Sequence, residues 1–219
     1  MAPANVDATP LRDVIAEQVR DRIISGDLLP GHRLREEDLA GEYNASRLPV
    51  REALARLVSE GFVEVTKFRG ASVAVPSVSA GLELVRVRQS LEGLAAELAA
   101  DRRGGEGAHE ISEVLRRGQE AVRRRRFDDL PPLVESFHGL LAAASGNREL
   151  ELLLEQVRVK MRWVFRSNLP ERAADCWAEH AEILSAVLAG FPGLARELME
   201  RHVGADAAAY VALPRDAEG

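Results

Sequence analysis

A change of hydrophobic pattern at Pro76-Ser77 constrains the fold of this chain more than any other feature. Before it, short stretches of helical spacing are followed by a segment that alternates in the manner of β-strands. From about residue 79 onward, apolar residues recur at helical spacing and no convincing strand pattern appears. Proline stops regular pairing, and 219 residues suffice for two small domains. We therefore predict one domain over residues 1–76 and a second over residues 77–219.

The first domain combines short helices with a β-hairpin. The stretches of helical spacing are 11–25, 36–43 and 46–60. Ser46 is of the right type to cap the third helix, and Gly61 is placed to end it. Alternating residues predict strands over 62–66 and 71–75, joined by a tip at 67–70. Three helices followed by a hairpin are typical of a winged helix-turn-helix.

The second domain is predicted to be entirely helical. Its helical stretches are 79–100, 106–126, 129–144, 148–168, 171–189 and 192–211. Ser79 is expected to cap the first of them, and Gly146 and Gly190 mark two of the breaks. Six helices joined by short links favour an antiparallel bundle. The fold class is therefore mainly α.

Composition excludes several classes of protein. The formal net charge of −6 argues against a protein coated in positive charge for nonspecific binding of nucleic acid. Cys176 is the only cysteine, so an intrachain disulfide and a multi-cysteine zinc site are both excluded. No apolar run reaches the roughly 20 residues of a membrane span, and Met1–Pro10 does not look like a secretory signal. We expect an intracellular, cytoplasmic protein with no membrane partner.

Local charge points to DNA at the third helix and the hairpin. Residues 44–76 hold five Lys and Arg residues against three Glu residues, inside a chain of net negative charge. In a winged helix-turn-helix the third helix enters the major groove, which predicts base contacts from Ser46, Arg47 and Arg51. Lys67 and Arg69 at the hairpin tip are offered to the DNA backbone or minor groove. The alternative is a solvated helix face beside an ordinary hairpin, and the order of the elements favours DNA.

Three histidines of the second domain are placed to meet. His180 and His202 each lie eleven residues from the turn at Phe191, so in an antiparallel hairpin they reach the same height. His138 lies eight residues before the Gly146 break and is also well inside the bundle. Three converging imidazoles suit Zn²⁺ or Ni²⁺ with an open position for water or a ligand. The alternative is three separate histidines, each satisfied by its own hydrogen bonds.

The first domain resembles the GntR superfamily of bacterial repressors. The matching segments are Leu28–Leu34, Leu39-Ala40, Ser46–Leu54, Glu60-Gly61 and Arg69-Gly70. Leu48 departs from the threonine usual in this pattern. The resemblance implies that Arg47 and Arg51 read an operator and that Gly70 lets the wing approach DNA.

The second domain resembles the ligand-binding domain of the FadR subfamily, the FCD type. The matching segments are Val85–Ala100, Phe137-His138, Ser145–Asn147, Glu179-His180 and Arg201-His202. In metal-binding members of the family, an aspartate four residues before the first histidine joins the three histidines. Val134 occupies that position here, so one carboxylate ligand is lost and occupancy by metal becomes a question for experiment.

The resemblance also implies an effector pocket. Arg88 is expected to approach the carboxylate of the effector, with Arg162 and Asn168 as further lining residues. The alternative for Arg88 is a salt bridge with Glu92, four residues later on one helix.

These observations predict a homodimeric, ligand-responsive repressor that binds double-stranded operator DNA and is released by a small carboxylate, through a histidine-held metal. The same regulator with a metal-free pocket for an acyl or other apolar ligand is the alternative. A metal-dependent hydrolase is less favoured, because no general base or nucleophile motif accompanies the histidines, so we expect no enzyme activity.

Overall fold

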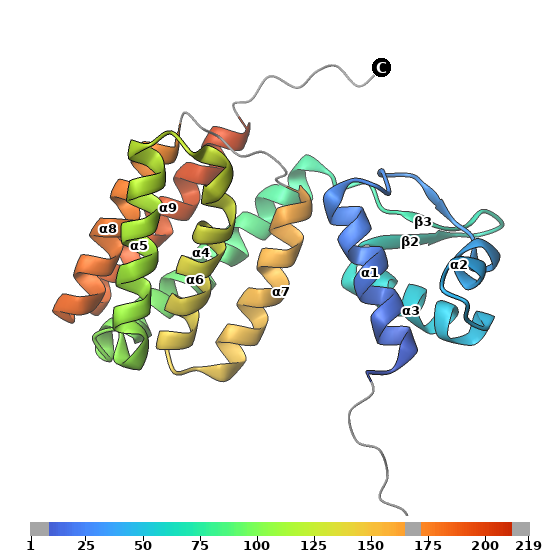
Figure 1. The fold of residues 1–219 in the computed structure, drawn as a ribbon, viewed down its shortest axis with the longest axis horizontal. Helices are drawn as coiled ribbons and strands as arrows, with labels where there is room; N and C mark the ends of the chain where they lie inside the picture. Colours follow the sequence, from blue (N-terminus) through green and yellow to red (C-terminus); the bar gives the residue numbers. More distant parts are fainter. Residues whose placement is uncertain (1–8, 165–171, 212–219) are drawn as a thin grey trace, which may run out of the picture. The chain divides into compact units, whose positions relative to one another are not determined.

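The computed structural model describes residues 9–164 and 172–211, and the chain divides into two compact units, residues 1–77 and 78–219 (Figure 1). We call residues 9–77 the head and residues 78–211 the bundle. Each unit is described by itself. The overall prediction, a mainly helical chain with a small winged sheet followed by an all-helical bundle, is confirmed.

The head contains three helices and a three-stranded antiparallel sheet. Its elements in chain order are α1 (Leu11–Ser25), β1 (Arg33–Leu34), α2 (Glu36–Glu42), α3 (Arg47–Glu60), β2 (Val63–Thr66) and β3 (Gly70–Val73). The sheet order is β1-β3-β2, with Glu64 opposite Ser72 in the hairpin. Sequence patterns missed β1, because two residues are too few to show alternation; its Arg33 pairs with Ser72.

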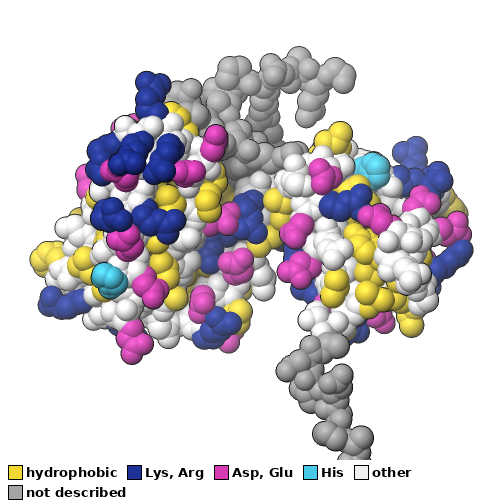
Figure 2. All heavy atoms as spheres, viewed as in Figure 1, with side chains coloured by type: hydrophobic (Ala, Val, Ile, Leu, Met, Phe, Trp, Pro, Cys, Tyr) yellow, Lys and Arg dark blue, Asp and Glu magenta, His cyan; other side chains and the backbone are white. Residues whose placement is uncertain are grey.

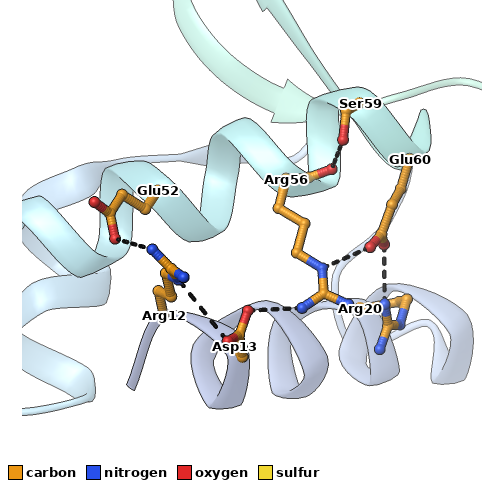
Figure 3. Close-up of polar contacts among 7 residues, drawn as sticks. All are labelled: Arg12, Asp13, Arg20, Glu52, Arg56, Ser59 and Glu60. Atoms are coloured by element: carbon orange, nitrogen blue, oxygen red, sulfur yellow. Dashed lines mark hydrogen bonds and ion pairs between the residues drawn. The ribbon is translucent and has the colours of Figure 1, made fainter. Parts of the chain in front are cut away.

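A buried apolar seam and a line of ion pairs hold α1 against α3. Ile15 and Val19 of α1 and Leu57 of α3 are fully buried. Along the edge of this seam, Asp13 accepts a hydrogen bond from Arg56 at 2.8 Å, and Glu60 contacts both Arg56 and Arg20 (Figure 3). Arg56 therefore links α1 and α3.

The bundle consists of six α-helices and two short 3-10 turns within the described residues. They are α4 (Val78–Asp101), η1 (Gly105–Gly107), α5 (Ala108–Arg123), η2 (Phe127–Asp129), α6 (Leu130–Ala144), α7 (Arg148–Val164), α8 (Ala173–Ala189) and α9 (Pro192–Val211). Helix α4 packs along α9 and also contacts α6, α7 and α8 (Figure 1). A side chain on the inner face of α4 can therefore meet residues from four other helices.

Two details of the predicted bundle are corrected. Helix α4 begins at Val78, so Ser79 lies inside the first turn and not at the cap. The stretch 106–126 is divided, because the 3-10 turn at Gly105–Gly107 precedes α5 and the helix ends at Arg123. The arginines that follow, Arg124–Arg126, are exposed. Figure 2 shows dark-blue Lys and Arg side chains gathered over this part of the bundle.

Candidate nucleic-acid interface and candidate metal centre

The three residues predicted to read bases lie at the start of α3. Ser46 occupies the N-cap position, and the side chains of Arg47 and Arg51 are 62% and 65% exposed. The prediction that the Ser46 hydroxyl caps the helix is wrong within the described residues, since it makes no capping hydrogen bond. The physical reason is Pro49, the third helical residue, which has no backbone N–H to donate to a capping oxygen.

Both arginines are held by acidic residues of α2. Arg47 Nη2 lies 2.5 Å from Glu37 Oε1. Arg51 makes a two-pronged contact with Glu36, with Nε–Oε1 at 3.1 Å and Nη2–Oε2 at 2.9 Å. These hydrogen bonds from Arg51 are the main reason that the pKa of Glu36 lies below its ordinary value. Sequence reasoning missed this arrangement, for which the run Glu36-Glu37-Asp38 was the available signal.

The hairpin tip presents the three predicted wing residues. Lys67, Arg69 and Gly70 are all exposed, and Lys67 Nζ lies 5.1 Å from the ring centroid of Phe68. Gly70 has φ of +82°, a backbone conformation that residues other than glycine rarely adopt. No heavy atom lies within 4 Å of the place that a Cβ would occupy. The tip therefore offers two cations on a turn with open space beside it.

The bundle brings its three candidate ligands together. His138 of α6, His180 of α8 and His202 of α9 are each at most 1% exposed, and one ligand atom from each lies within 4.8 Å of the others. His180 Nε2 and His202 Nε2 are 3.1 Å apart. Two nitrogens bound tetrahedrally to one zinc ion would be about 3.4 Å apart, given Zn–N bonds of about 2.1 Å. The cluster is therefore close to a ligating arrangement.

Two carboxylates orient this cluster from outside. Glu92 Oε2 of α4 lies 3.1 Å from His138 Nδ1, and Glu179 Oε2 of α8 lies 2.7 Å from His202 Nδ1. Each carboxylate accepts a hydrogen bond from Nδ1–H, so the Nε2 lone pairs of these two rings are left for the centre. His180 Nε2 must then donate to His202 Nε2 when no ion is bound. Neither carboxylate was predicted in this role.

The charges of the cluster follow from burial and pairing. Burial alone would raise the pKa of Glu92. The electrostatic attraction and the hydrogen bond of His138, together with the nearby charges of Arg88 and Arg158, bring this pKa to about 2. Burial likewise opposes the shift of Glu179, and hydrogen bonds from His202 and Arg172 bring its pKa to about 2. Burial lowers the pKa of His180 well below its ordinary value, so its imidazole is neutral at pH 7 and can act as a ligand.

Several buried polar atoms of this region lack a hydrogen-bond partner among the residues that the structure describes. They are His138 Nε2, His180 Nδ1, Glu92 Oε1, Arg88 Nε and Arg158 Nη1. An unsatisfied buried polar group costs about 1–3 kcal/mol, and native proteins contain few of them. Imidazole nitrogens suit a divalent ion and guanidinium N–H groups suit an anion. The residues present therefore fit a bound metal ion and an acidic ligand.

The predicted effector residues divide into three outcomes. Arg88 is 11% exposed, and its Nε lies 3.5 Å from Glu92 Oε1, the ion pair expected at this spacing. Arg162 contacts Glu135 at 2.8 Å and is 39% exposed, whereas Arg158, one turn earlier on α7, is 11% exposed and contributes to the electrostatics of Glu92. Arg158 is thus the inward arginine of α7, which sequence reasoning missed. Asn168 lies outside the described residues.

The position of the absent aspartate is apolar in its surroundings. Val134 is partly buried and packs against the main apolar core of the bundle. Its neighbour Glu135 points to Arg162 and not to the histidines. A recess of about 630 Å³ between α5 and α6 includes His109, Glu113 and Gly139 but none of the site residues.

Across residues 9–164 and 172–211, no helix is both long and apolar enough to cross a membrane.

Comparison with known proteins identifies both units. Residues 6–73 match the model of the bacterial regulatory proteins of the gntR family, and residues 83–205 match the FCD domain. The Probable D-xylose utilization operon transcriptional repressor of Paenarthrobacter nicotinovorans is 30% identical over 206 residues, covering 89% of this chain and 88% of the relative. The HTH-type transcriptional regulator YdhC of Bacillus subtilis is 29% identical, covering 82% and 81%.

Solved structures agree with this assignment. A structure named as a GntR transcriptional regulator from Rhodococcus sp. RHA1 aligns with a TM-score of 0.74 at 25% identity, covering 94% of this chain and all of the other. McbR/YncC of E. coli has the same fold, with a TM-score of 0.73 at 23% identity over 93% and 98% of the two chains. The chain therefore belongs to the GntR family of bacterial transcriptional regulators, in the group whose second domain is an FCD domain, and is not an enzyme.

Proposed function

We propose that this protein is a cytoplasmic, homodimeric repressor that leaves its operator when a small carboxylate binds inside the FCD domain beside a histidine-held metal. Residues 77–219 supply the effector site and the dimer contact, and residues 1–76 bind DNA. Relatives that are named as repressors include the Paenarthrobacter protein and GlaR of E. coli, and this supports the direction of control.

The observation that carries the effector part is the group of unpartnered polar atoms inside the bundle. His138, His180 and His202 would hold a divalent ion, with Glu92 and Glu179 fixing two of the rings. When bound, the ion offers a carboxylate an open coordination position. Arg88 and Arg158 hold buried N–H groups that a carboxylate can accept from, so the surroundings favour an acidic effector over a neutral one.

The DNA part rests on the exposed arginines of α3. Ser46, Arg47 and Arg51 are proposed to reach base edges. Lys67 and Arg69 are proposed to contact the DNA backbone or minor groove, with Gly70 allowing the wing to approach DNA. Linkage then requires that the effector bind the DNA-free protein more tightly than the operator complex. Equal effector affinity in the two states would contradict this mechanism.

One experiment tests the DNA part directly. Duplexes that the protein retains from a random pool define its preferred site, and titrations then compare that site with a scrambled one. Arg51→Ala should reduce the preference by about tenfold or more, since one bidentate base contact is lost. Arg116→Ala is a matched control, because Arg116 makes the same two-pronged contact with Glu113 and is 64% exposed in the bundle. Unchanged preference in Arg51→Ala would refute the assignment of α3.

A second experiment tests the metal. Metal content per chain is measured on untagged protein purified without chelators, and on His180→Ala as control. Near-stoichiometric metal in the unaltered chain and its loss in the variant are expected. A chain that is metal-free and does not take up Zn²⁺ or Ni²⁺ would favour the second candidate, a metal-free pocket for an acyl or other apolar ligand. The apolar packing of Val134 is the observation that favours that candidate.

A further inference from the structure

The only cysteine of the chain lies beside the histidine cluster. Cys176 precedes His180 by four residues on α8, so the two side chains share one face of the helix. Cys176 Sγ lies 3.9 Å from His180 Nε2, the same nitrogen that lies 3.1 Å from His202 Nε2. A sulfur and two nitrogens from α8 and α9 therefore converge on one place.

These distances are near those of a shared metal ion. With a Zn–S bond of about 2.3 Å and a Zn–N bond of about 2.1 Å, the tetrahedral S···N separation is about 3.6 Å. The group of ligand atoms within 4.8 Å of one another contains the three histidines alone, so Cys176 lies at the His180 side of that group. Cys176 has a single side-chain torsion, so its sulfur changes position by rotation about that one bond.

The other candidate donors are engaged elsewhere. Glu92 and Glu179 contact the Nδ1 atoms of His138 and His202, on the side of each ring away from Nε2. Glu135 pairs with Arg162, and Val134 has no donor atom. The buried Nε2 of His138 has no hydrogen-bond partner among the described residues, an independent observation that fits a cluster arranged to bind an ion. Among the residues that the structure describes, the Cys176 sulfur is thus the nearest fourth donor to the cluster.

We propose that Cys176 is the fourth protein ligand of the ion held by His138, His180 and His202, as a thiolate in place of the carboxylate that Val134 has removed. The thiol releases its proton to solvent as the sulfur–metal bond forms. A thiolate favours zinc over manganese and magnesium, which prefer oxygen. An effector carboxylate then joins as a fifth ligand, as zinc allows. This inference rests on the metal part of the proposed function.

Titration of the metal-free, full-length protein with Co²⁺ distinguishes the sulfur ligand proposed here from metal binding by the three histidines alone. Cobalt in a site with a thiolate gives visible d–d bands and, in addition, an intense near-ultraviolet band of charge transfer from sulfur. Because Cys176 is the only cysteine, that band has one source. Cys176→Ser should keep the d–d bands, lose the charge-transfer band, and bind Zn²⁺ about ten- to a hundredfold more weakly, a loss at least as large as that of an outer-shell partner. His180→Ala should lose both sets of bands.

Each outcome decides one of the claims. Visible bands without charge transfer in the unaltered chain would show that metal binds and that Cys176 is not a ligand, which overturns this inference and leaves the proposed function standing. Failure to bind cobalt or zinc at all would overturn the metal part of the proposed function and this inference with it. In a further check, stoichiometric Zn²⁺ should slow the reaction of the single thiol with a thiol reagent at least tenfold. An unchanged rate would count against a sulfur ligand.

Discussion

The head and the bundle use the same arginine–glutamate chemistry in opposite surroundings. Arg51 and Glu36 meet in the head with side chains that are 65% and 35% exposed. Arg88 and Glu92 meet in the bundle with side chains that are 11% and 0% exposed. Exposed ion pairs contribute little to the stability of the fold and rearrange readily. A buried charge that loses its partner destabilises the fold strongly. We therefore expect Arg51 to exchange Glu36 for DNA readily, and we expect the buried charges of the bundle to keep their partners when a ligand binds.

The largest effect is expected from breaking the buried pair. Glu92→Ala removes the partner of His138 Nδ1 and Arg88 and should destabilise the metal-free bundle by about 3–5 kcal/mol, because a buried cation and a buried imidazole lose the carboxylate that pairs with them. Glu92→Gln should cost less, since its amide oxygen still accepts from His138. Urea unfolding followed by tryptophan fluorescence reports the bundle alone, because Trp163 and Trp177 are the only tryptophans of the chain.

The matched control is an exposed ion pair of the bundle, between Arg116 and Glu113. Glu113→Ala removes the partner of Arg116, which lies three residues further along α5. We expect no measurable change in its urea midpoint, because both side chains are largely solvated. Equal midpoints for Glu92→Ala and Glu113→Ala would mean that burial does not distinguish the two ion pairs.

A smaller effect is expected from one glycine in each unit. At Gly118 of α5 an added Cβ would meet ring atoms of Trp177 at 2.2 Å, while at Gly41 of α2 nothing lies within 4 Å. Gly118→Ala should destabilise by about 1–3 kcal/mol through overpacking. Gly41→Ala should stabilise by about 0.4–1 kcal/mol, because alanine loses less entropy in a helix. The same substitution thus has opposite signs.

Fluorescence-detected unfolding measures the first variant, and hydrogen exchange of the α2 amides measures the second. Trp177 also lies edge-on to His180, with ring centroids 4.9 Å apart. Displacement of its ring in Gly118→Ala should therefore weaken zinc binding as well. A Gly118→Ala protein with unaltered stability and zinc affinity would show that the core around the histidines adapts more easily than its packing indicates.

The comparison of the two units also explains what the sequence could predict. Periodicity and glycine breaks located the helices to within a few residues, and the equal spacing of His180 and His202 from Phe191 anticipated their meeting on α8 and α9. These signals are local or depend on one hairpin.

Most features that escaped prediction depend on contacts between segments far apart in the sequence. Which arginine of α7 turns inward, Arg158 or Arg162, is decided by Glu135 on α6 and Glu92 on α4. The sequence indicated Glu92 only as a partner of Arg88 on the same helix. Its contact with His138 joins two different helices, and the two residues are 46 positions apart in sequence. Ser46 was misjudged as a cap for a local reason, since Pro49 removes the N–H that it would have bound.

The smallest effect is expected from the exposed pair of the head. Glu36→Gln removes the charge that holds Arg51 and should raise operator affinity by about two- to fivefold, because an exposed pair is easily exchanged and a negative charge near phosphate is lost. Glu113→Gln, the same change of charge in the bundle, should leave operator affinity unaltered. Titrations at one fixed salt concentration make the comparison.

Acid should act on the same contact in the unaltered protein. The pKa of Glu36 is lowered in the folded state by its hydrogen bonds from Arg51, so the contact is fully present above the ordinary value of 4.5 and is lost only as pH falls through the lowered folded pKa. NMR titration of the Glu36 carboxyl should therefore give a pKa below 4.5, and Arg51→Gln should raise it. If Glu36→Gln instead weakened operator binding while Arg51→Gln still raised this pKa, Glu36 would be aligning Arg51 for the DNA and not competing with it.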